Sequence, residues 1–324
     1  MVIFLTGGTG FIGGAVARLL RERGDDVVAL VRTPGRAEAL SAIGATLVQG
    51  GLADVDVIRS AMAGADAVIH GAAVYEVGIR PSERPAMYET NVVGTENVLG
   101  AARDLGIPKV VYVSTVAAFG NTEGRVVEEG YVHRERYTSY YDETKHLAHR
   151  RAQRLIADGL PCVVVQPGAV YGPGDHSQLG NQLTQFLKGR LPLLAFGDLG
   201  LSLVHRDDVA QGVLLALDKG VPGEHYVLGG EVSTLRGFID AAAKVSGRRP
   251  PRGPMPASVV KAAAALGPVV GPMLGYPPNM KELVSSSHKV TFWARSDKAK
   301  RELGWTPRPL EQGMRDTLLA IGAI

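Results

Sequence analysis

The sequence predicts an α/β fold: a doubly wound parallel sheet with a smaller, interleaved C-terminal lobe. In its first half, short apolar runs rich in β-branched residues alternate with amphipathic helix patterns. The runs are continuously apolar, which is typical of strands buried on both faces of a parallel sheet. The first run passes into a glycine-rich turn that opens a helix. Open sheets of this kind hold ligands at the carboxyl ends of their strands.

The expected elements follow in regular order along the first half of the chain. The first strand is the run Val2-Ile3-Phe4-Leu5. Further apolar runs predict strands over 27–31, 45–49, 67–70, 110–113 and 162–165. Apolar positions at helical spacing predict a helix from Phe11 to Leu20, which Gly24 ends. The same spacing predicts helices over 35–43, Val55–Met62, 87–105 and 141–157.

The turn after the first strand is built to hold a dinucleotide. It reads Thr6-Gly7-Gly8-Thr9-Gly10-Phe11-Ile12-Gly13, with Gly7, Gly10 and Gly13 spaced three apart. A helix N-terminus offers unpaired N–H groups and the positive end of its dipole, so a pyrophosphate binds there. Glycines permit the tight turn and the close approach of phosphate to backbone.

The pattern loosens after Pro167, where proline and glycine become denser. We therefore expect residues 1–166 to form a dinucleotide-binding domain and residues 167–324 to form mainly a smaller substrate-binding lobe. Arg206-Asp207-Asp208 opens a helix pattern with acids in its first turn. From this pattern we expect residues 204–228 to return to the first domain.

Composition excludes several other classes of protein. Of 324 residues, 45% are hydrophobic, and 35 basic residues against 32 acidic ones give a net charge of +3. This balance argues against a nucleic-acid surface. Cys162 is the single cysteine, so no intrachain disulfide or cysteine metal cluster is expected. His146 and His149 could share a metal, but no third ligand is apparent, and we predict no metal. Because the first strand starts at residue 2, we expect a cytoplasmic protein.

The apolar stretch 256–276 resembles a membrane span only in composition. It contains Lys261 and is interrupted by Gly267-Pro268 and Gly271-Pro272. A span needs about twenty predominantly apolar residues, and proline breaks a straight helix. We therefore predict a buried helix followed by an apolar loop or short helix, and no stable membrane span.

Two groups of side chains could carry acid–base chemistry. Tyr141 and Lys145 are four residues apart on a predicted helix and so share one face. A nearby ammonium favours the tyrosinate and brings a phenol closer to the useful pKa range. Ser114 and Thr115 follow a buried strand, where a hydroxyl can hold a carbonyl oxygen beside the phenol. Either hydroxyl could instead cap local backbone groups.

These motifs together resemble the extended short-chain dehydrogenases/reductases, along nearly the whole chain. The matching segments are the glycine turn, Asp66-Ala67-Val68-Ile69-His70-Gly71-Ala72-Ala73, Asn91-Val92-Val93-Gly94-Thr95, the hydroxyl pair, Tyr141 with Lys145, residues 167–174, Val204-His205-Arg206-Asp207-Asp208 and Leu303-Gly304-Trp305-Thr306-Pro307. The resemblance implies a Rossmann-type nucleotide-binding fold and an NAD(P)-dependent enzyme.

The resemblance also implies roles for individual residues. Tyr141 would be the general acid in reduction, or the base in oxidation, and Lys145 would bind the nicotinamide ribose and lower the pKa of the phenol. Thr115 matches the catalytic Ser/Thr, Ser114 would be its neighbour, and Asn91 matches a helix asparagine of the family. The cofactor would contact Gly7, Gly10, Phe11, Ile12, Gly13, Leu52, Ala72, Ala73, Lys145, Pro167, Gly168 and Val170.

The residues after the second strand favour NADP(H) over NAD(H). An acid there would hold the adenosine ribose of NAD, but this chain has Arg32, with Arg36 one turn later. A guanidinium suits the 2′-phosphate of NADP, although a solvent-facing arginine is the alternative. The family's acid near adenine is also missing, because Gly50-Gly51-Leu52 stands where the family has Gly-Asp-Leu.

Within the family, the chain most resembles dihydroflavonol-reductase-like carbonyl reductases. Nucleotide-sugar epimerases commonly carry an arginine just before the Val204-His205 position, to hold a pyrophosphate, and residues 200–203 contain no cation. We therefore predict NADPH-dependent reduction of a ketone or aldehyde, with a small-molecule carbonyl or hydroxyl compound as substrate. The alternatives are an epimerase or dehydratase with tightly bound NAD, and a non-catalytic NADP-binding regulator. Tyr75 and Tyr171 are expected to line the substrate pocket, and the helices over 87–105 and 141–157 to form a homodimer.

Overall fold

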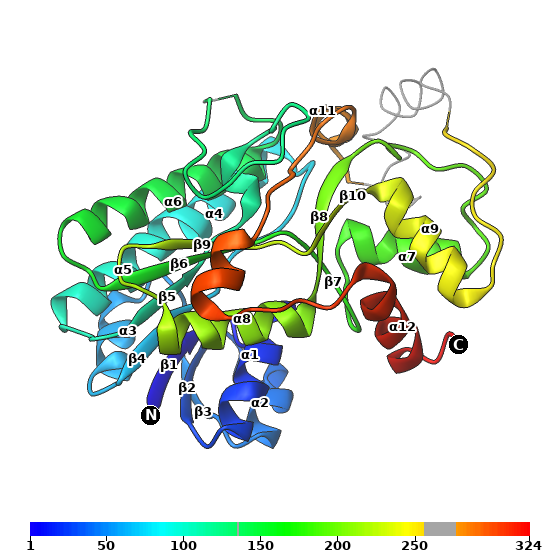
Figure 1. Ribbon diagram of the computed structural model, residues 1–324. Coiled ribbons are helices and arrows are strands. Elements are labelled where there is room, and N and C mark those ends of the chain that lie inside the picture. The colour runs from blue at the N-terminus through cyan, green and yellow to red at the C-terminus, as the bar shows by residue number, and fades with distance from the viewer. Residues whose placement is uncertain (135, 256–276) are drawn as a thin grey trace.

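A parallel sheet of seven strands forms the centre of the computed structural model, which describes residues 1–134, 136–255 and 277–324 (Figure 1). The strand order is β3-β2-β1-β4-β5-β6-β9, and every neighbouring pair is parallel. The strands are β1 (Val2–Thr6), β2 (Asp26–Val31), β3 (Thr46–Gln49), β4 (Ala67–His70), β5 (Val110–Val113), β6 (Cys162–Pro167) and β9 (His225–Leu228). The predicted parallel sheet is therefore confirmed.

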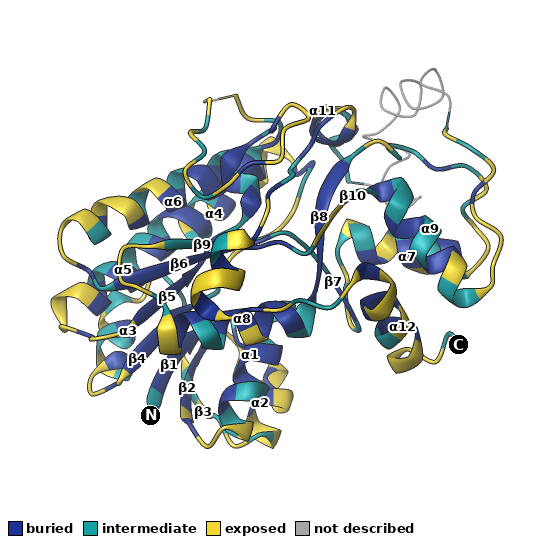
Figure 2. Ribbon diagram, viewed as in Figure 1, coloured by how far each residue is buried: buried dark blue, intermediate teal, exposed yellow. Residues whose placement is uncertain are grey.

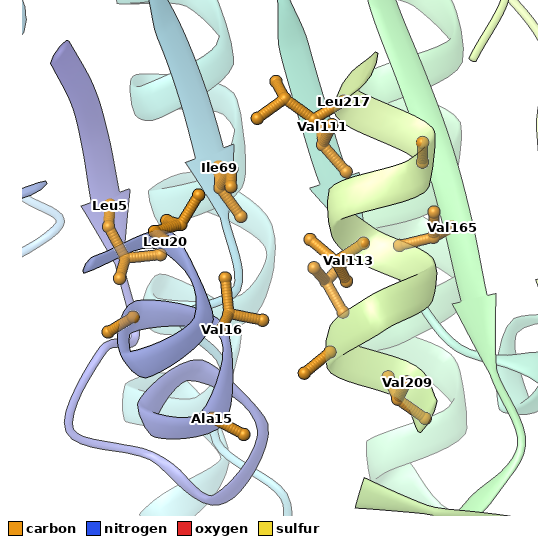
Figure 3. Packing of buried hydrophobic residues seen from close by; sticks show 14 of the residues in the cluster. Leu5, Ala15, Val16, Leu20, Ile69, Val111, Val113, Val165, Val209 and Leu217 are labelled. Atoms are coloured by element: carbon orange, nitrogen blue, oxygen red, sulfur yellow. The ribbon is translucent and has the colours of Figure 1, made fainter. Parts of the chain in front are cut away.

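Helices cover both faces of this sheet, which makes it doubly wound. On one face, α1 (Phe11–Glu22) packs beside α8 (Arg206–Lys219), and their apolar side chains meet the sheet (Figure 3). On the other face lie α3 (Val55–Met62), α5 (Gly94–Asp104) and α6 (Tyr140–Ala157). Most strands of this sheet are buried, the edge strand β3 is partly exposed, and the outer helix faces are exposed (Figure 2).

Two predicted helices of this domain are interrupted. The helix expected over 35–43 is a 3₁₀ turn (Pro34–Arg36) followed by the short α2 (Glu38–Ala42). The helix expected over 87–105 starts earlier, as a 3₁₀ turn (Pro81–Glu83) and α4 (Arg84–Tyr88), and it reaches α5 through a π-helical turn (Glu89–Val93). Such π turns are frequent at functional sites, and this one carries Asn91.

The second lobe is built on a sheet of three strands in the order β10-β8-β7. Strand β8 (Gly200–His205) pairs parallel with β7 (Ala169–Tyr171) and antiparallel with β10 (Glu231–Thr234). Its core includes side chains from α7 (Gln178–Leu187), α9 (Leu235–Ser246) and α12 (Leu310–Ala320). A 3₁₀ turn (Val116–Phe119), α11 (Met280–Ser287) and a π turn (Ala299–Leu303) complete the described elements.

The chain passes between the two sheets more than once. After β8, the helix α8 packs on α1, and β9 then joins the edge of the large sheet. The expected helix and loop over 256–276 lie outside the described residues. In the part of the chain that is described, no helix has the length and apolar character needed to cross a membrane.

Candidate active site

The glycine turn leaves an open cradle at the N-terminus of α1. A Cβ on Gly7, where φ is +80°, would lie 2.6 Å from the backbone nitrogen of Ala72. A Cβ on Gly13 would lie 2.1 Å from the carbonyl oxygen of Gly7. Gly10 is the N-cap and offers no side chain to the first-turn N–H groups, which leaves them for an anion. These residues therefore fit a dinucleotide pyrophosphate.

A directed hydrogen-bond chain anchors this cradle to its neighbours. Thr95 Oγ1 donates to the Asn91 carbonyl at 2.7 Å, so it must accept the Nε2 proton of His70 at 3.0 Å. His70 Nδ1 is then an acceptor, and it receives the hydroxyl of Thr6 at 2.7 Å. Thr6 Oγ1 in turn accepts from the nitrogen of Ala72 at 3.3 Å. Burial, with a smaller effect of Lys145, lowers the pKa of His70 to about 3, so the ring stays neutral.

Tyr141 and Lys145 lie one turn apart near the start of α6, and both are buried. Ser139 caps the helix by accepting from the nitrogen of Asp142 at 3.1 Å. Burial raises the pKa of Tyr141 well above 10, and a weaker hydrogen bond from Thr115 acts in the opposite direction. The phenol is thus protonated at neutral pH and suited to donate a proton.

Burial also lowers the pKa of Lys145, to about 8. Its Nζ lies over the ring of Tyr112, 5.5 Å from the centroid. We expected Lys145 to lower the pKa of the Tyr141 phenol; burial raises that pKa here, and the effect of Lys145 itself stays a prediction. The ammonium remains suited to hold ribose hydroxyls.

The two hydroxyls after β5 serve different neighbours. Thr115 faces the crevice, where it accepts from the nitrogen of Ala117 at 3.2 Å and interacts with the Tyr141 phenol. Ser114 is buried, and its Oγ is 3.1 Å from Nδ1 of His149. Adjacent residues in extended backbone point in opposite directions, which explains the difference. Ser114 is therefore bonded within the core, and its place beside Thr115 in the pocket stays a prediction.

Asn91 acts as a clamp on the loop after β4. Its Oδ1 accepts from the nitrogen of Val74 at 2.7 Å, and its Nδ2 donates to the Val74 oxygen at 3.0 Å. The same Nδ2 is 3.0 Å from Thr144 Oγ1, which donates to the carbonyl of Tyr141 at 2.9 Å. With these partners, Asn91 joins the loop after β4 to the first turn of α6.

The two tyrosines expected in the substrate pocket have different surroundings. Tyr75 is 56% exposed and stands against Tyr141, with ring centroids 4.8 Å apart. Tyr171 is buried in the core of the second lobe, where its ring contacts Phe238 and its hydroxyl donates to the Leu310 carbonyl at 3.3 Å. Tyr171 is the last residue of β7, and its ring is turned into the core of the lobe, so its contact with a substrate stays a prediction.

The remaining expected cofactor contacts lie at the carboxyl ends of the strands. Arg32 and Arg36 are exposed just after β2. Gly168 is tightly packed, since a Cβ there would lie 2.1 Å from the Ser202 oxygen. Leu52 lies against Gly94. Phe11, Ile12, Ala72 and Val170 are half-buried, Ala73 is exposed and Pro167 is buried.

Several polar residues near the site were not among the predicted site residues. The guanidinium of Arg206 lies over the ring of Phe11, 5.5 Å from its centroid, where α1 opens. Glu282 on α11 accepts from the backbone nitrogen of Tyr140 at 2.6 Å. His146 and His149 bond the Ala118 carbonyl and Ser114. No group of three or more potential ligands that could hold a metal occurs among the described residues.

The chain is similar to one protein family and to two relatives that are named as reductases. The model of the NAD dependent epimerase/dehydratase family matches residues 3–229. A candidate dihydroflavonol 4-reductase of Synechocystis sp. is 32% identical over 97% of this chain and 93% of its own length. The 4-hydroxy-2-methyl-3-oxo-4-farnesyl-3,4-dihydroquinoline-1-oxide ketoreductase of Stigmatella aurantiaca is 31% identical over 99% of this chain and 97% of its own.

A solved structure of lower identity shares the fold. The UDP-glucuronic acid 4-epimerase of Bacillus cereus, in complex with UDP-glucuronic acid and NAD, has a TM-score of 0.80. It is 20% identical, with 99% of each chain covered.

Proposed function

The chain belongs to the NAD dependent epimerase/dehydratase family, and from this membership we propose that it is an NADPH-dependent reductase of a ketone or aldehyde. Both curated relatives described above carry reductase names, and both match over nearly their full length. The proposed reaction converts the carbonyl to a secondary or primary alcohol.

Each residue of the site has its own task in the proposed reaction. A bound nicotinamide supplies the hydride that reaches the carbonyl carbon. Tyr141, with its buried protonated phenol, donates the proton to the carbonyl oxygen. Thr115 holds that oxygen with its hydroxyl, and Lys145 holds ribose hydroxyls with its ammonium. The backbone N–H groups at the start of α1 hold the pyrophosphate.

Strand β8 is the observation that carries the choice of a reductase over an epimerase. Its residues Gly200 to His205 are all buried and include no lysine or arginine. Leu201 and Leu203 lie in the core of the second lobe, and Ser202 Oγ bonds the Ala294 carbonyl at 3.0 Å. A sugar-nucleotide pyrophosphate would need a cation here. The strand instead favours a substrate without such an anion.

A cavity in the second lobe supports an apolar substrate. It has a volume of about 530 Å³, and its lining includes the apolar residues Leu194, Phe196, Pro254, Met255 and Val284 together with the polar residues Asp198, Thr234, Arg236 and His288. Its cation, Arg236, is already paired with Asp240 at 2.9 Å. Such a lining favours a ligand with a hydrophobic body.

Kinetics with both nucleotides test the proposal. The purified protein would be mixed with NADPH or NADH and a panel of an aliphatic 3-oxo ester, an aryl ketone and an aromatic aldehyde. We expect nucleotide oxidation with at least one panel compound and a higher kcat/KM for NADPH. A protein that oxidises neither nucleotide, yet releases stoichiometric NAD on denaturation, would support the epimerase and contradict the reductase.

A further inference from the structure

We propose that Glu282 is a positioning residue for the proton donor, because it fixes the first turn of the helix that carries Tyr141. This inference rests on the proposed function, since it assigns Glu282 a task in the same reaction. Glu282 lies on α11, about 140 residues after Tyr141 in the chain, and no motif marks it.

The Glu282 carboxylate is 8% exposed and has three partners from three segments. Its Oε1 accepts from the backbone nitrogen of Tyr140 at 2.6 Å, and its Oε2 accepts from Asn279 Nδ2 at 2.9 Å. The guanidinium of Arg84, on α4, is 3.6 Å from Oε2 and lies over the Tyr140 ring, 4.8 Å from its centroid. A buried carboxylate is stable only with such partners.

The bond to Tyr140 acts where α6 needs a partner from outside. Tyr140 is the first residue of the helix, so its N–H has no acceptor within the helix. A carboxylate at a helix N-terminus also interacts favourably with the helix dipole. Ser139 takes the nitrogen of Asp142, and Glu282 takes that of Tyr140. The peptide between Ser139 and Tyr140 is thus held at its nitrogen, one residue before Tyr141, and with it the first turn of the helix that carries the phenol.

The segment that carries Glu282 also holds the loop of Tyr75. The nitrogen of Asn279 donates to the Gly78 carbonyl at 2.9 Å. Gly78 has φ of +81°, and a Cβ there would lie 2.8 Å from the Pro277 side chain, so the two segments are in close contact. One short segment therefore contacts both the loop of Tyr75 and the helix of Tyr141. The rings of these two tyrosines are in contact with each other.

The test compares Glu282→Ala and Glu282→Gln with Asp25→Ala as a matched control. Asp25 is also a buried carboxylate paired with an arginine, Arg23 at 2.6 Å, but it precedes β2, at the amino end of that strand. Turnover is measured with NADPH and the panel carbonyl that the parent reduces fastest. Hydrogen exchange of the peptide spanning Tyr140 is measured without nucleotide, as a readout independent of activity.

For Glu282→Ala we expect kcat to fall about 30-fold, because a small displacement of a reacting group costs that much. The dissociation constant for NADPH should stay within about twofold, and exchange at the start of α6 should accelerate. Glu282→Gln keeps an acceptor for the Tyr140 nitrogen and should recover most of kcat. Asp25→Ala should change neither kcat nor this exchange.

An unchanged kcat or unchanged exchange in Glu282→Ala would overturn the proposal. If the alanine variant does not fold, Glu282→Asp serves as the test, because it keeps the charge but its side chain is one methylene shorter. An unaltered kcat in Glu282→Asp would also overturn the proposal. Tyr141→Phe, measured in parallel, distinguishes a failure of the proposed reductase function from a failure of the proposed role of Glu282. A fully active Tyr141→Phe would reject the reductase itself, whereas an inactive Tyr141→Phe beside a fully active Glu282→Ala would reject only the role of Glu282.

Discussion

The ring of Tyr75 stands edge-on against the ring of Tyr141, with centroids 4.8 Å apart and an interplanar angle of 89°. Tyr141 is 8% exposed and Tyr75 is 56% exposed, so the outer ring covers the inner one and presents its own surface to the crevice. Edge-to-face pairs of this kind add about 0.5–1.5 kcal/mol beyond area burial. Tyr75 is therefore the exposed aromatic side chain beside the buried phenol.

Replacing Tyr75 should therefore affect the substrate more than the nucleotide. We expect Tyr75→Ala to raise KM for the carbonyl compound about 10-fold, the loss of one aromatic contact, while the KM for NADPH is unchanged. Tyr75→Phe keeps the ring and should behave as the parent. Steady-state kinetics check this, and equal KM values in the alanine variant and the parent would argue against a substrate contact.

Removing the phenolic proton should stop the chemistry but not nucleotide binding. Tyr141→Phe keeps the buried ring, so we expect kcat to fall by about 10³-fold or more, at the level of a lost proton donor. The dissociation constant for NADPH, measured by fluorescence titration, should change less than about twofold. Retention of most of the activity would mean that another group donates the proton.

The buried ammonium of Lys145 should lower the free energy of unfolding at neutral pH. Below about pH 8 the folded and unfolded chains both carry its proton, and the folded state bears a buried charge. Between about pH 8 and its ordinary pKa of 10.5 only the unfolded chain keeps the proton, so this contribution to stability rises with pH. Lys145→Met should therefore raise the free energy of unfolding at pH 7, by on the order of 3 kcal/mol, and abolish turnover.

Urea unfolding at pH 7 and pH 10 measures this effect. The stabilisation by Lys145→Met should shrink at the higher pH, where the native lysine is neutral. Lys109→Met is the control, because Lys109 is exposed and its replacement should leave stability unchanged. A destabilised Lys145→Met at pH 7 would show that the ammonium has stabilising partners in the folded protein.

Sequence patterns predicted the strands β1 to β6 of the large sheet, but not β9, because a buried parallel strand needs continuous apolar residues. The same argument located the glycine cradle, whose geometry depends on neighbouring residues such as Gly7, Gly10 and Gly13. Local spacing also put Tyr141 and Lys145 on one helix face. Features of this kind need no knowledge of distant contacts.

Other parts of the site depend on contacts that no local pattern records. Ser114 and Thr115 are adjacent and chemically alike, and only the direction of each side chain separates packing from the site. Tyr171 ends β7 in a motif of the family, but its ring packs into the core of the second lobe. The Tyr140–Glu282 bond spans 142 residues and could be seen only after folding.

The arginines after β2 should decide between the two nucleotides. Arg32 and Arg36 are exposed and have no carboxylate partner among the described residues, so both are available to a 2′-phosphate. We expect Arg32→Ala to raise KM for NADPH about 10-fold, as for the loss of one charge-assisted bond, and to leave KM for NADH unchanged. The control is Arg18→Ala, an exposed arginine of α1 paired with Glu22. Equal use of NADH by the parent, unaltered in Arg32→Ala, would remove the NADP preference.

The hydrogen-bond chain through His70 should stabilise the cradle. In Thr95→Val the buried Nε2–H of His70 loses its acceptor, which costs about 1–3 kcal/mol. Thr95→Ser keeps the hydroxyl and should restore most of that stability. Because the chain ends at the nitrogen of Ala72, which packs against Gly7, we also expect weaker NADPH binding in the valine variant. Urea unfolding and nucleotide titration measure the two effects. Equal stability of the valine and serine variants would show that packing, and not this hydrogen bond, is what Thr95 contributes.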